Sequence, residues 1–554
     1  MSRRRGSIAV AVDLAFVALL VAASVVTGFG GLIVYAVPTE PAGDGYGLDS
    51  LYVLEPPGAD GATVPPPGSG GNPGAERRFV AGLEAIGATE LHERGVTGEG
   101  VKVGVIGSGF DPRHPSIAGN VAARDRIDAD ASDAADETAH DTAVAEIVSR
   151  TAPGADLYLV EIGTEPTPER YAAAIEWLLA NDVDVIVDSG SYFPPTMEGM
   201  DRITDAADNA SAQGVVFVTS AGNYAERHWA GTDAGEGWAS FASGIEANPL
   251  AGGDPVRGRV SLRLYWNSSA DYDLYLYRHV RGGEDPVVAK STRRQSRNDS
   301  LPASEAIDAA VPKGTYYVAV YARAGAANDT HTHLRLFSTR HSLGYATPEG
   351  SLVAPATSDR VIAVGAFDAD GGATRAYSSR GASAGEVDVG APDGVETAVA
   401  GRFYGTSAAA PFVAGTAALM EASAGDLSPE ETRRILHETA RASDGAKRID
   451  ALAAVEAASG AVRRPAEAYD ATSDGNGTAA STAASDGNET TASTAASDES
   501  ETAGANADAN TADGAPENES ARDSAKTTAE RRASAGESAA PEHGTGCDGT
   551  AASG

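Results

Sequence analysis

The stretch Tyr404–Met420, which reads YGTSAAAPFVAGTAALM, joins a tight turn to a run of small and apolar residues. Gly405 and Thr406 are expected to form the turn and to place Ser407 at the start of an Ala-rich helix. At a helix N-terminus the free backbone N–H groups and the helix dipole favour a developing negative charge. Pro411 is expected in the first turn, where its missing N–H costs little. The stretch indicates a nucleophilic serine, although an isolated Gly-Thr-Ser more often caps a buried helix.

Three short Val-rich runs precede this stretch in the chain and indicate buried strands. They are Val101–Ile106, Val183–Val187 and Val215–Thr219, and helical patterns separate them. Strands that are buried on both faces of a parallel sheet have this continuous apolar character. A further helix is predicted after Ser428, where Glu431 completes a capping box. The chain is therefore predicted to belong to the α/β class.

The sequence between about residues 255 and 340 follows a different pattern. RVSLRLYW, YDLYLYR and GTYYVAVY alternate apolar and polar residues, which fits an antiparallel sheet with one face in water. The α/β pattern then resumes at RVIAVGAF, residues 360–367. This order predicts a β-sandwich that is inserted into the α/β domain rather than a domain that follows it.

Both ends of the chain differ from its middle. Residues 14–37 carry no charge, follow three arginines and are long enough to span a bilayer as a helix. A signal peptide and a membrane anchor both fit this pattern and both imply export, while a buried core helix is the remaining alternative. Residues 38–80 are rich in Pro and Gly and are predicted to be a linker. Residues 460–554 are predicted to be an acidic, disordered Ser/Thr/Ala-rich tail, because they lack the apolar residues needed to fold.

The chain is strongly acidic. It has 78 Asp and Glu against 42 Lys and Arg, which gives a formal net charge of -36. This charge argues against a nucleic-acid partner, whose phosphates would repel it. It favours a protein of a halophilic microbe that is kept soluble by carboxylates, although the tail alone could supply much of the acidity. The single cysteine, Cys547, excludes an intrachain disulfide and does not reveal the compartment.

The segment Gly405–Pro411, GTSAAAP, resembles the serine motif of the subtilisin-like serine peptidases, the subtilases. The resemblance implies an α/β fold, a three-layer sandwich around a central parallel sheet over residues 82–458, interrupted by the β-sandwich at residues 255–340. It also implies that Ser407 is the nucleophile of an acyl-enzyme mechanism. The insert itself resembles pre-peptidase C-terminal modules.

Two further segments resemble motifs of the same family. AHDTAVAE resembles the histidine motif and implies that His140 is the general base for Ser407. TSAGNYAE resembles the oxyanion segment and implies that Asn223 donates a hydrogen bond to the oxyanion. Taken alone, His140 would be an ordinary surface histidine and Asn223 a turn residue, so both roles depend on the resemblance.

The chain departs from the family pattern where the catalytic aspartate is expected. VGVIGSG places Gly107 at that position, directly after the first Val-rich run. The histidine motif differs as well, because Asp141, Ala143 and Glu146 stand where the family has Gly, His and Gly. The carboxylate that orients the imidazole is therefore missing from its usual position.

Four acidic residues could replace that carboxylate. Asp111 is expected to be an ordinary acid in a turn. Asp141 adjoins the base but should point off the helix, and Glu146 should lie on the wrong face of that helix. Asp188 ends the strand whose counterpart lines the substrate cleft in the family, so it is the preferred substitute.

Three functions remain open at this point. The first is a serine endopeptidase that acts on proteins or peptides and is impaired by the missing Asp, whose loss in a subtilisin lowers turnover by about 10⁴-fold. The second is a pseudopeptidase that binds extended peptides by strand addition at the cell surface. The third is a structural surface protein in which the β-sandwich and the tail carry the function.

The expected protein is an extracellular or cell-surface monomer, exported and anchored in the membrane if residues 14–37 are retained. Its expected partners are protein or peptide substrates, with no nucleic acid. No cofactor is expected. The family resemblance allows for structural calcium, but the sequence shows no loop to which such a site can be assigned.

Overall fold

The computed structural model describes residues 73–462 except for 128–134, 165, 233–236, 295–302, 324–331, 370–371, 383–385 and 444–445. The expected signal or anchor segment at residues 14–37, most of the linker and nearly all of the tail lie outside the described residues. Within the described part, no helix combines the length and the apolar character needed to cross a membrane.

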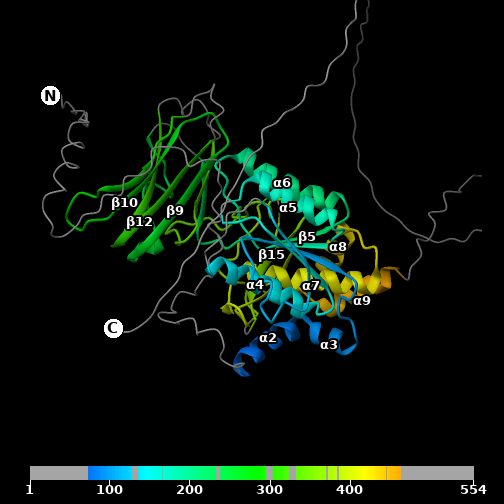
Figure 1. Ribbon diagram of the computed structural model, residues 1–554. Coiled ribbons are helices and arrows are strands. Elements are labelled where there is room, and N and C mark those ends of the chain that lie inside the picture. Colours follow the sequence, from blue (N-terminus) through cyan, green and yellow to red (C-terminus); the bar gives the residue numbers. More distant parts are fainter. Residues whose placement is uncertain are drawn as a thin grey trace, which may run out of the picture. The chain divides into compact units, whose positions relative to one another are not determined.

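A mixed sheet forms the centre of the fold (Figure 1). Its strand order is β19-β20-β16-β15-β5-β4-β1-β3-β2, and all neighbouring pairs are parallel except β19 with β20. The three strands expected from the Val-rich runs are β1, β4 and β5, and they lie side by side. The strands of this sheet are β1 (Lys102–Gly107), β2 (Val121–Arg126), β3 (Asp156–Glu161), β4 (Val185–Asp188), β5 (Val216–Ser220), β15 (Ile362–Asp368), β16 (Val389–Asp393), β19 (Arg441–Ser443) and β20 (Ala446–Arg448).

Helices cover both faces of the sheet, which confirms the predicted three-layer α/β fold (Figure 1). One apolar cluster joins one sheet face to α2 (Pro73–Ile86), α3 (Ala88–Glu93), α4 (Ala135–Thr151), α7 (Thr406–Ala424), α8 (Pro429–Thr439) and α9 (Ala451–Val462). A second cluster joins the other face to α5 (Pro168–Ala180) and α6 (Met197–Ala212). On β1, Val105 belongs to the first cluster and Ile106 to the second, because successive strand residues point to opposite faces. Ser428 and Glu431 form the predicted capping box of α8.

Helix α7 runs through the first helical layer, and every residue from Thr406 to Met420 is buried. It crosses α4 at Gly415, where an added Cβ would lie 2.5 Å from the Cβ of Thr151. The small residues of the sequence therefore allow α7 to pack closely against α4. This packing fixes the helix that begins near Ser407 against the helix that carries His140.

The N-terminal boundary of the domain differs from the expected linker at residues 38–80. Helix α2 begins at Pro73, and Phe79 is fully buried. Phe79, Leu83 and Ile86 are spaced by four and three residues, so they lie on one face of the helix. They pack into the first apolar cluster, and the aromatic ring of Phe79 contacts that of Phe412 with centroids 5.9 Å apart. The helix was not predicted, because the Pro/Gly-rich composition of residues 38–80 indicated a linker.

The predicted β-sandwich is present between β5 and β15. One sheet has the order β12-β9-β14-β6, the other β11-β10-β13-β7 with β8 beside β13, and all their pairs are antiparallel. Their strands are β6 (His228–Thr232), β7 (Gly237–Trp238), β8 (Asn248–Pro249), β9 (Val256–Trp266), β10 (Tyr272–Arg278), β11 (Val287–Ser291), β12 (Ser304–Gly314), β13 (Tyr316–Ala322) and β14 (His333–Ser338), with a 3₁₀ turn at Ala251–Gly253.

The insert begins at His228, earlier than the expected residue 255. Strands β6, β7 and β8 are short, so their sequences show too few alternations to be recognised. The insert packs on the α/β domain through Phe337, whose ring contacts Phe193 and Tyr224 at centroid distances of 5.3 and 5.8 Å. It is therefore attached directly beside the segment that carries Asn223.

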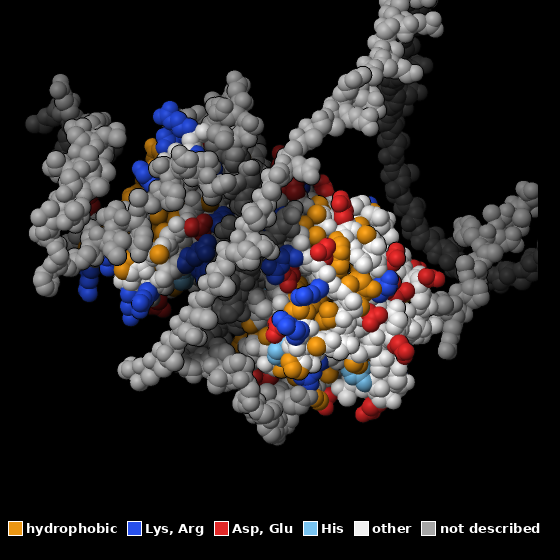
Figure 2. Space-filling view, in the orientation of Figure 1, with side chains coloured by type: hydrophobic (Ala, Val, Ile, Leu, Met, Phe, Trp, Pro, Cys, Tyr) orange, Lys and Arg blue, Asp and Glu red, His pale blue; other side chains and the backbone are white. Residues whose placement is uncertain are grey.

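The surface carries both signs of charge. Figure 2 shows acidic and basic side chains interspersed over the visible face of the α/β domain. The largest exposed apolar side chains among the described residues are Trp238, Val280, Val287 and Val288, all on the insert.

Replacing Phe79 by alanine should destabilise the domain by about 3–5 kcal/mol, because it removes a fully buried ring from the core and leaves a cavity. Urea unfolding of the whole chain at constant salt measures this change in the free energy of unfolding. Glu84→Ala, an exposed position on the same helix, is the matched control and should change stability by less than about 0.5 kcal/mol. Equal stability of the two variants would contradict the packing of α2.

Candidate active site

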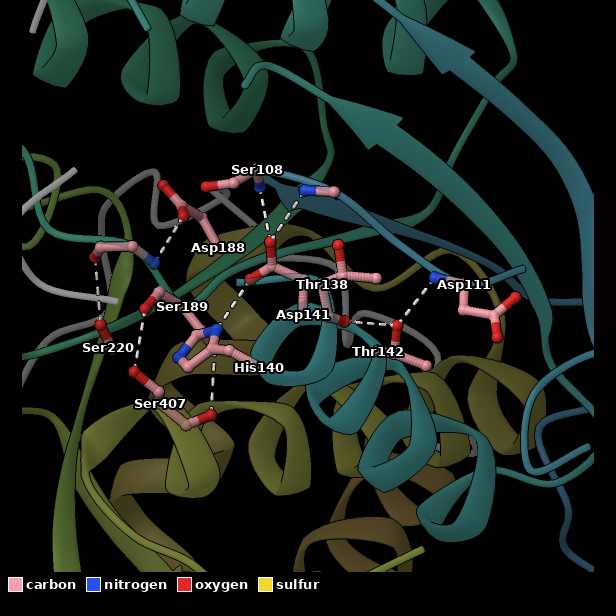
Figure 3. A network of polar contacts seen from close by, with 12 residues as sticks. Ser108, Asp111, Thr138, His140, Asp141, Thr142, Asp188, Ser189, Ser220 and Ser407 are labelled. Atoms are coloured by element: carbon pink, nitrogen blue, oxygen red, sulfur yellow. Dashed lines mark hydrogen bonds and ion pairs between the residues drawn. The ribbon is translucent and has the colours of Figure 1, made fainter. Parts of the chain in front are cut away.

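Ser407 lies in the first turn of α7, where the sequence predicts it. The residue before the helix, Gly405, has φ 103°, a left-handed conformation that favours glycine. Because Ser407 is the second residue of the helix, its backbone N–H has no acceptor within the helix. The Ser407 hydroxyl donates a hydrogen bond to the main-chain oxygen of Ser189, with Oγ and O 3.0 Å apart (Figure 3).

Pro411 lies deeper in the helix than expected. Helix α7 begins at Thr406, so Pro411 is in the second turn and not in the first. Its missing N–H leaves the carbonyl oxygen of Ser407 without the usual helical donor. That oxygen accepts a hydrogen bond from the hydroxyl of Ser189 instead, at 3.1 Å. Pro411 thus allows Ser189 and Ser407 to form two reciprocal hydrogen bonds.

Asn223 follows β5 and contacts the turn before α7. Its Oδ1 accepts hydrogen bonds from the N–H and the hydroxyl of Thr406, at 3.0 and 3.3 Å. These two donors fix the orientation of the amide, because Nδ2 cannot accept them. Nδ2 is left without a hydrogen-bond partner among the described residues and, like the N–H of Ser407, is available as a donor at the start of α7.

His140 lies in α4 and is almost fully buried, with 1% of its surface exposed. Its ring meets that of Phe403 edge to face at a centroid distance of 5.2 Å. His140 lies beside Ser407 and Ser189 (Figure 3), but no direct hydrogen bond joins it to the Ser407 hydroxyl within the described residues. The structure therefore brings His140, Ser407 and Asn223 together from three separate motifs.

The carboxylate beside His140 belongs to Asp141. His140 Nδ1 and Asp141 Oδ1 are 2.7 Å apart (Figure 3). The second carboxylate oxygen accepts hydrogen bonds from the backbone N–H groups of Ser108 and Gly109, at 2.6 and 3.1 Å. The expectation that Asp141 points off the helix is therefore wrong, because these two N–H groups at the end of β1 hold its carboxylate inward.

The Asp141 carboxylate lies against Gly107, in the space that a side chain at residue 107 would need. A Cβ added at Gly107 would lie 2.6 Å from Cγ of Asp141 and 2.7 Å from its Oδ2. Both distances are far below van der Waals contact, so a side chain at 107 and the present Asp141 carboxylate exclude each other. The Asp141 carboxylate thus occupies the space in which a side chain at residue 107 would begin.

Asp188, the preferred substitute from the sequence, is held by other partners. Its carboxylate accepts hydrogen bonds from the hydroxyls of Tyr171 and Tyr192, at 2.7 and 3.1 Å, and from the N–H of Gly190, at 2.8 Å. None of the hydrogen bonds or ion pairs of the described residues joins it to His140. Complete burial raises the pKa of Asp188 to about 6, and the three hydrogen bonds oppose this rise. The structure places Asp188 near the site, one residue before Ser189, without contact to the base.

The two other acidic candidates also have separate roles. Asp111 is exposed, and its carboxylate accepts a hydrogen bond from the N–H of Arg113, as expected for an acid in a turn. Glu146 is buried and accepts the N–H of Ala398 with both oxygens, each at 2.9 Å. Burial raises the pKa of Glu146. Neither carboxylate contacts His140.

A further anchoring residue, Asp393, was missed in the sequence. It lies at the end of β16, is fully buried and accepts the N–H of Gly405 at 3.1 Å. The guanidinium of Arg375 binds the other oxygen, Oδ1, at 2.6 Å, and the hydroxyl of Tyr377 donates to Oδ2, the oxygen that accepts from Gly405. Asp393 thus ties the turn before Ser407 to the sheet. The sequence patterns predicted no strand at residues 389–393, so they gave no signal for this residue.

No group of three or more His, Cys, Asp and Glu residues that could hold a metal ion occurs in the described part of the chain.

The helix-flanked parallel sheet, the serine at the start of a buried helix and the neighbouring histidine and amide define the class of α/β serine hydrolases. Within that class the chain belongs to the subtilase family, peptidase S8, whose model matches residues 98–244 and 283–484, more than half of the chain.

Several Bacillus subtilisins are similar to part of the chain. Subtilisin E of Bacillus subtilis strain 168 is 32% identical over 155 residues, which are 26% of this chain and 39% of that protein. Subtilisin of Bacillus pumilus is also 32% identical over 155 residues, and the match spans 54% of its length. The solved structure of the Clostridium perfringens CspB protease is 16% identical with a TM-score of 0.49, covering 68% of this chain and 98% of that one.

Replacing Asp188 by asparagine should change how stability depends on pH. The folded-state pKa of Asp188 lies near 6, above its usual 3.8. The folded state therefore binds the proton more tightly, so the contribution of Asp188 to stability is fully present below about pH 3.8 and is lost as the pH rises from there through about 6. At about 1.4 kcal/mol per pKa unit the loss is about 3 kcal/mol.

Urea unfolding of wild type and Asp188→Asn between about pH 4 and pH 7, at constant ionic strength, measures this effect. The stability difference between the two proteins should shift in favour of the variant as the pH rises. Glu84→Gln, at an exposed position of α2, controls for the loss of a carboxylate. A difference that stays constant with pH would contradict the assignment of this titration to Asp188.

Proposed function

We propose that the chain hydrolyses peptide bonds as a serine endopeptidase, with Ser407 as nucleophile and His140 as general base. The observation that carries this proposal is the locked amide of Asn223, whose Oδ1 is held by Thr406 so that Nδ2 is free to donate. An amide fixed in this way beside a serine at a helix N-terminus suits the binding of an oxyanion.

In the proposed reaction, Ser407 Oγ attacks the carbonyl carbon of the substrate and His140 Nε2 takes the hydroxyl proton. The carbonyl oxygen becomes an oxyanion and accepts hydrogen bonds from Asn223 Nδ2 and from the N–H of Ser407. His140 returns the proton to the leaving amine, and water then hydrolyses the acyl-enzyme by the same steps. The dipole of α7 favours the negative charge that develops at its N-terminus.

One rearrangement must precede this reaction. The Ser407 hydroxyl donates to Ser189 O in the structure, and it must turn to donate to His140 Nε2. Rotation of the Ser407 side chain about its Cα–Cβ bond is the proposed movement, and Figure 3 shows the His140 ring next to Ser407 in the site. Burial of both side chains favours this transfer, because water does not compete for the hydroxyl.

Several properties of the whole protein belong to the same proposal. Protein or peptide substrates follow from the peptidase family. Export, with membrane anchoring if residues 14–37 are retained, is supported by the uncharged run that follows three arginines. A halophilic source is supported by the net charge of -36. Binding of extended peptides without cleavage is the alternative, supported by Gly107 at the expected aspartate position.

A fluorophosphonate probe should label the purified protein in high salt, and Ser407→Ala should abolish the labelling, because only an activated serine reacts with this probe. Gel fluorescence with wild type and Ser407→Ala, together with cleavage of casein, gives the readout. Ser423→Ala, on the same helix but outside the site, is the control and should label as the wild type does. A wild-type protein that neither labels nor cleaves would favour the peptide-binding alternative.

Replacing Asn223 by alanine should lower kcat by about 10²–10³-fold, the magnitude known for an oxyanion-hole asparagine in a subtilisin, while KM changes little. Steady-state kinetics on a chromogenic peptide measure both constants. The exposed Asn209→Ala, on α6, serves as the comparison and should retain wild-type kinetics. If Asn223→Ala kept its kcat, the amide would not bind the oxyanion.

A further inference from the structure

We propose that Asp141 is the carboxylate that orients His140, so that the orienting acid comes from the residue next to the base and not from the end of β1. This inference rests on the proposed function, because it assigns a positioning residue to the same reaction. If Asp141 supplies the carboxylate, Gly107 at the usual aspartate position is no longer a reason to expect low activity.

The geometry of Asp141 is that of a preorganised partner. The side chains of Asp141 and His140 are 4% and 1% exposed, so their contact is shielded from water. One oxygen lies 2.7 Å from His140 Nδ1, and the other accepts the N–H groups of Ser108 and Gly109. These two hydrogen bonds hold the carboxylate in place and prevent it from turning away from the imidazole.

Neighbouring residues on a helix do not normally face each other, so this contact needs a specific cause. The cause is the space left by Gly107, which lacks a side chain at the end of β1. The Asp141 carboxylate enters that space from α4 and meets the free N–H groups there. The Asp of the family pattern and the Gly after its histidine have thus exchanged places in this chain, at Gly107 and Asp141.

The contact has a chemical consequence for the base. A carboxylate oxygen only accepts hydrogen bonds, so Nδ1 of His140 must carry the proton that it donates to Oδ1. In the neutral imidazole Nε2 is then the nitrogen with the lone pair, and it is the one that must accept the Ser407 proton. As Nε2 becomes protonated during the reaction, the adjacent negative charge stabilises the imidazolium.

The other buried acids near the site cannot take this role in the observed arrangement. The carboxylate of Asp188 is held by two tyrosine hydroxyls and Gly190, and that of Glu146 is held by Ala398. Glu161 accepts the N–H of Phe110 and pairs with Arg126. Asp141 is thus the one acid of the described residues with a contact to His140.

Asp141→Asn is the decisive variant, because asparagine keeps the shape but not the two acceptors. Its oxygen would remain with the two N–H groups of Ser108 and Gly109, since an NH₂ group there would meet two donors. The NH₂ group would then face His140 Nδ1 and force it to become an acceptor. Nε2 would carry the proton and could no longer receive the one from Ser407.

We expect Asp141→Asn to lower kcat by about 10³–10⁴-fold with KM changed by less than about threefold, the effect of a wrong tautomer in a serine peptidase. Asp111→Asn, an exposed acid in the turn after β1, is the matched control and should keep its kcat within about threefold. A kcat of Asp141→Asn equal to that of Asp111→Asn would overturn the proposal.

Asp141 could act only by anchoring the turn at Ser108 and Gly109, and not by orienting His140. A second variant separates these two roles. Thr142→Val removes the adjacent anchor, the hydrogen bond from the N–H of Asp111 to Thr142 Oγ1, without touching His140. If anchoring alone mattered, both variants would lose a similar share of kcat. We expect a loss of less than about tenfold for Thr142→Val, and a loss as large as that of Asp141→Asn would overturn the assignment.

Gly107→Asp, which restores the aspartate of the family pattern, gives an independent test. We expect it to lower kcat and not to raise it. If the site simply lacked its carboxylate, this substitution would raise kcat. With Asp141 in place, the new side chain would collide with that carboxylate and add a second negative charge, so kcat should fall by about tenfold or more. An increase in kcat for Gly107→Asp would overturn the proposal.

A proton NMR measurement separates this inference from the proposed function. The Nδ1 proton of His140, bonded to a carboxylate, should give a strongly downfield resonance in the full-length protein that disappears in Asp141→Asn. This signal does not require turnover. Its presence in a protein that lacks peptidase activity would leave the orientation by Asp141 standing while the proposed function failed, and its absence in an active wild type would overturn the orientation alone.

Discussion

The close packing of α7 against α4 is the constraint on which the candidate site depends. Helix α7 is buried from Thr406 to Met420, and at Gly415 it approaches Thr151 too closely for any larger residue. Because both helices are held in one core, the positions of His140 and Ser407 are set by packing that lies far from either side chain. A site built in this way needs no flexible loop to bring base and nucleophile together.

The end of β1 imposes a second, chemical constraint. The backbone N–H groups after this strand require acceptors in a buried place, and side chains supply them: Asp141 for Ser108 and Gly109, and Thr142 for Asp111. An unpaired N–H group there would cost free energy. The acceptor can be attached to the strand or to a neighbouring helix, provided that its oxygen atoms reach the same place. A glycine at 107 is compatible with an ordered site for this reason.

The insert is joined to the core beside the site rather than at a distant loop. Its first strand begins five residues after Asn223, and the ring of Phe337 packs on Phe193 and Tyr224. Tyr265 adds a hydrogen bond from its hydroxyl to the oxygen of Pro194, at 2.8 Å. The segments that carry Ser189 and Asn223 are therefore braced by the sandwich. The positions of these two segments thus depend on contacts with the insert as well as on the α/β domain.

The class of the fold and the motifs that contain Ser407, His140 and Asn223 could be recognised from the sequence, whereas the order of the strands in the sheet could not. The fold class follows from the period of the apolar residues, which is a local signal. The roles of His140 and Asn223 followed only from the resemblance of their short motifs to those of a known family. The helix at Phe79 and the short strands of the insert escaped recognition, because their local signals are weak. The tertiary structure alone decided which carboxylate meets the base. Helical spacing alone predicted that Asp141 points away from His140. In the structure its carboxylate contacts His140, because Gly107 leaves space for it and the N–H groups of Ser108 and Gly109, more than thirty residues away in the chain, bind it there.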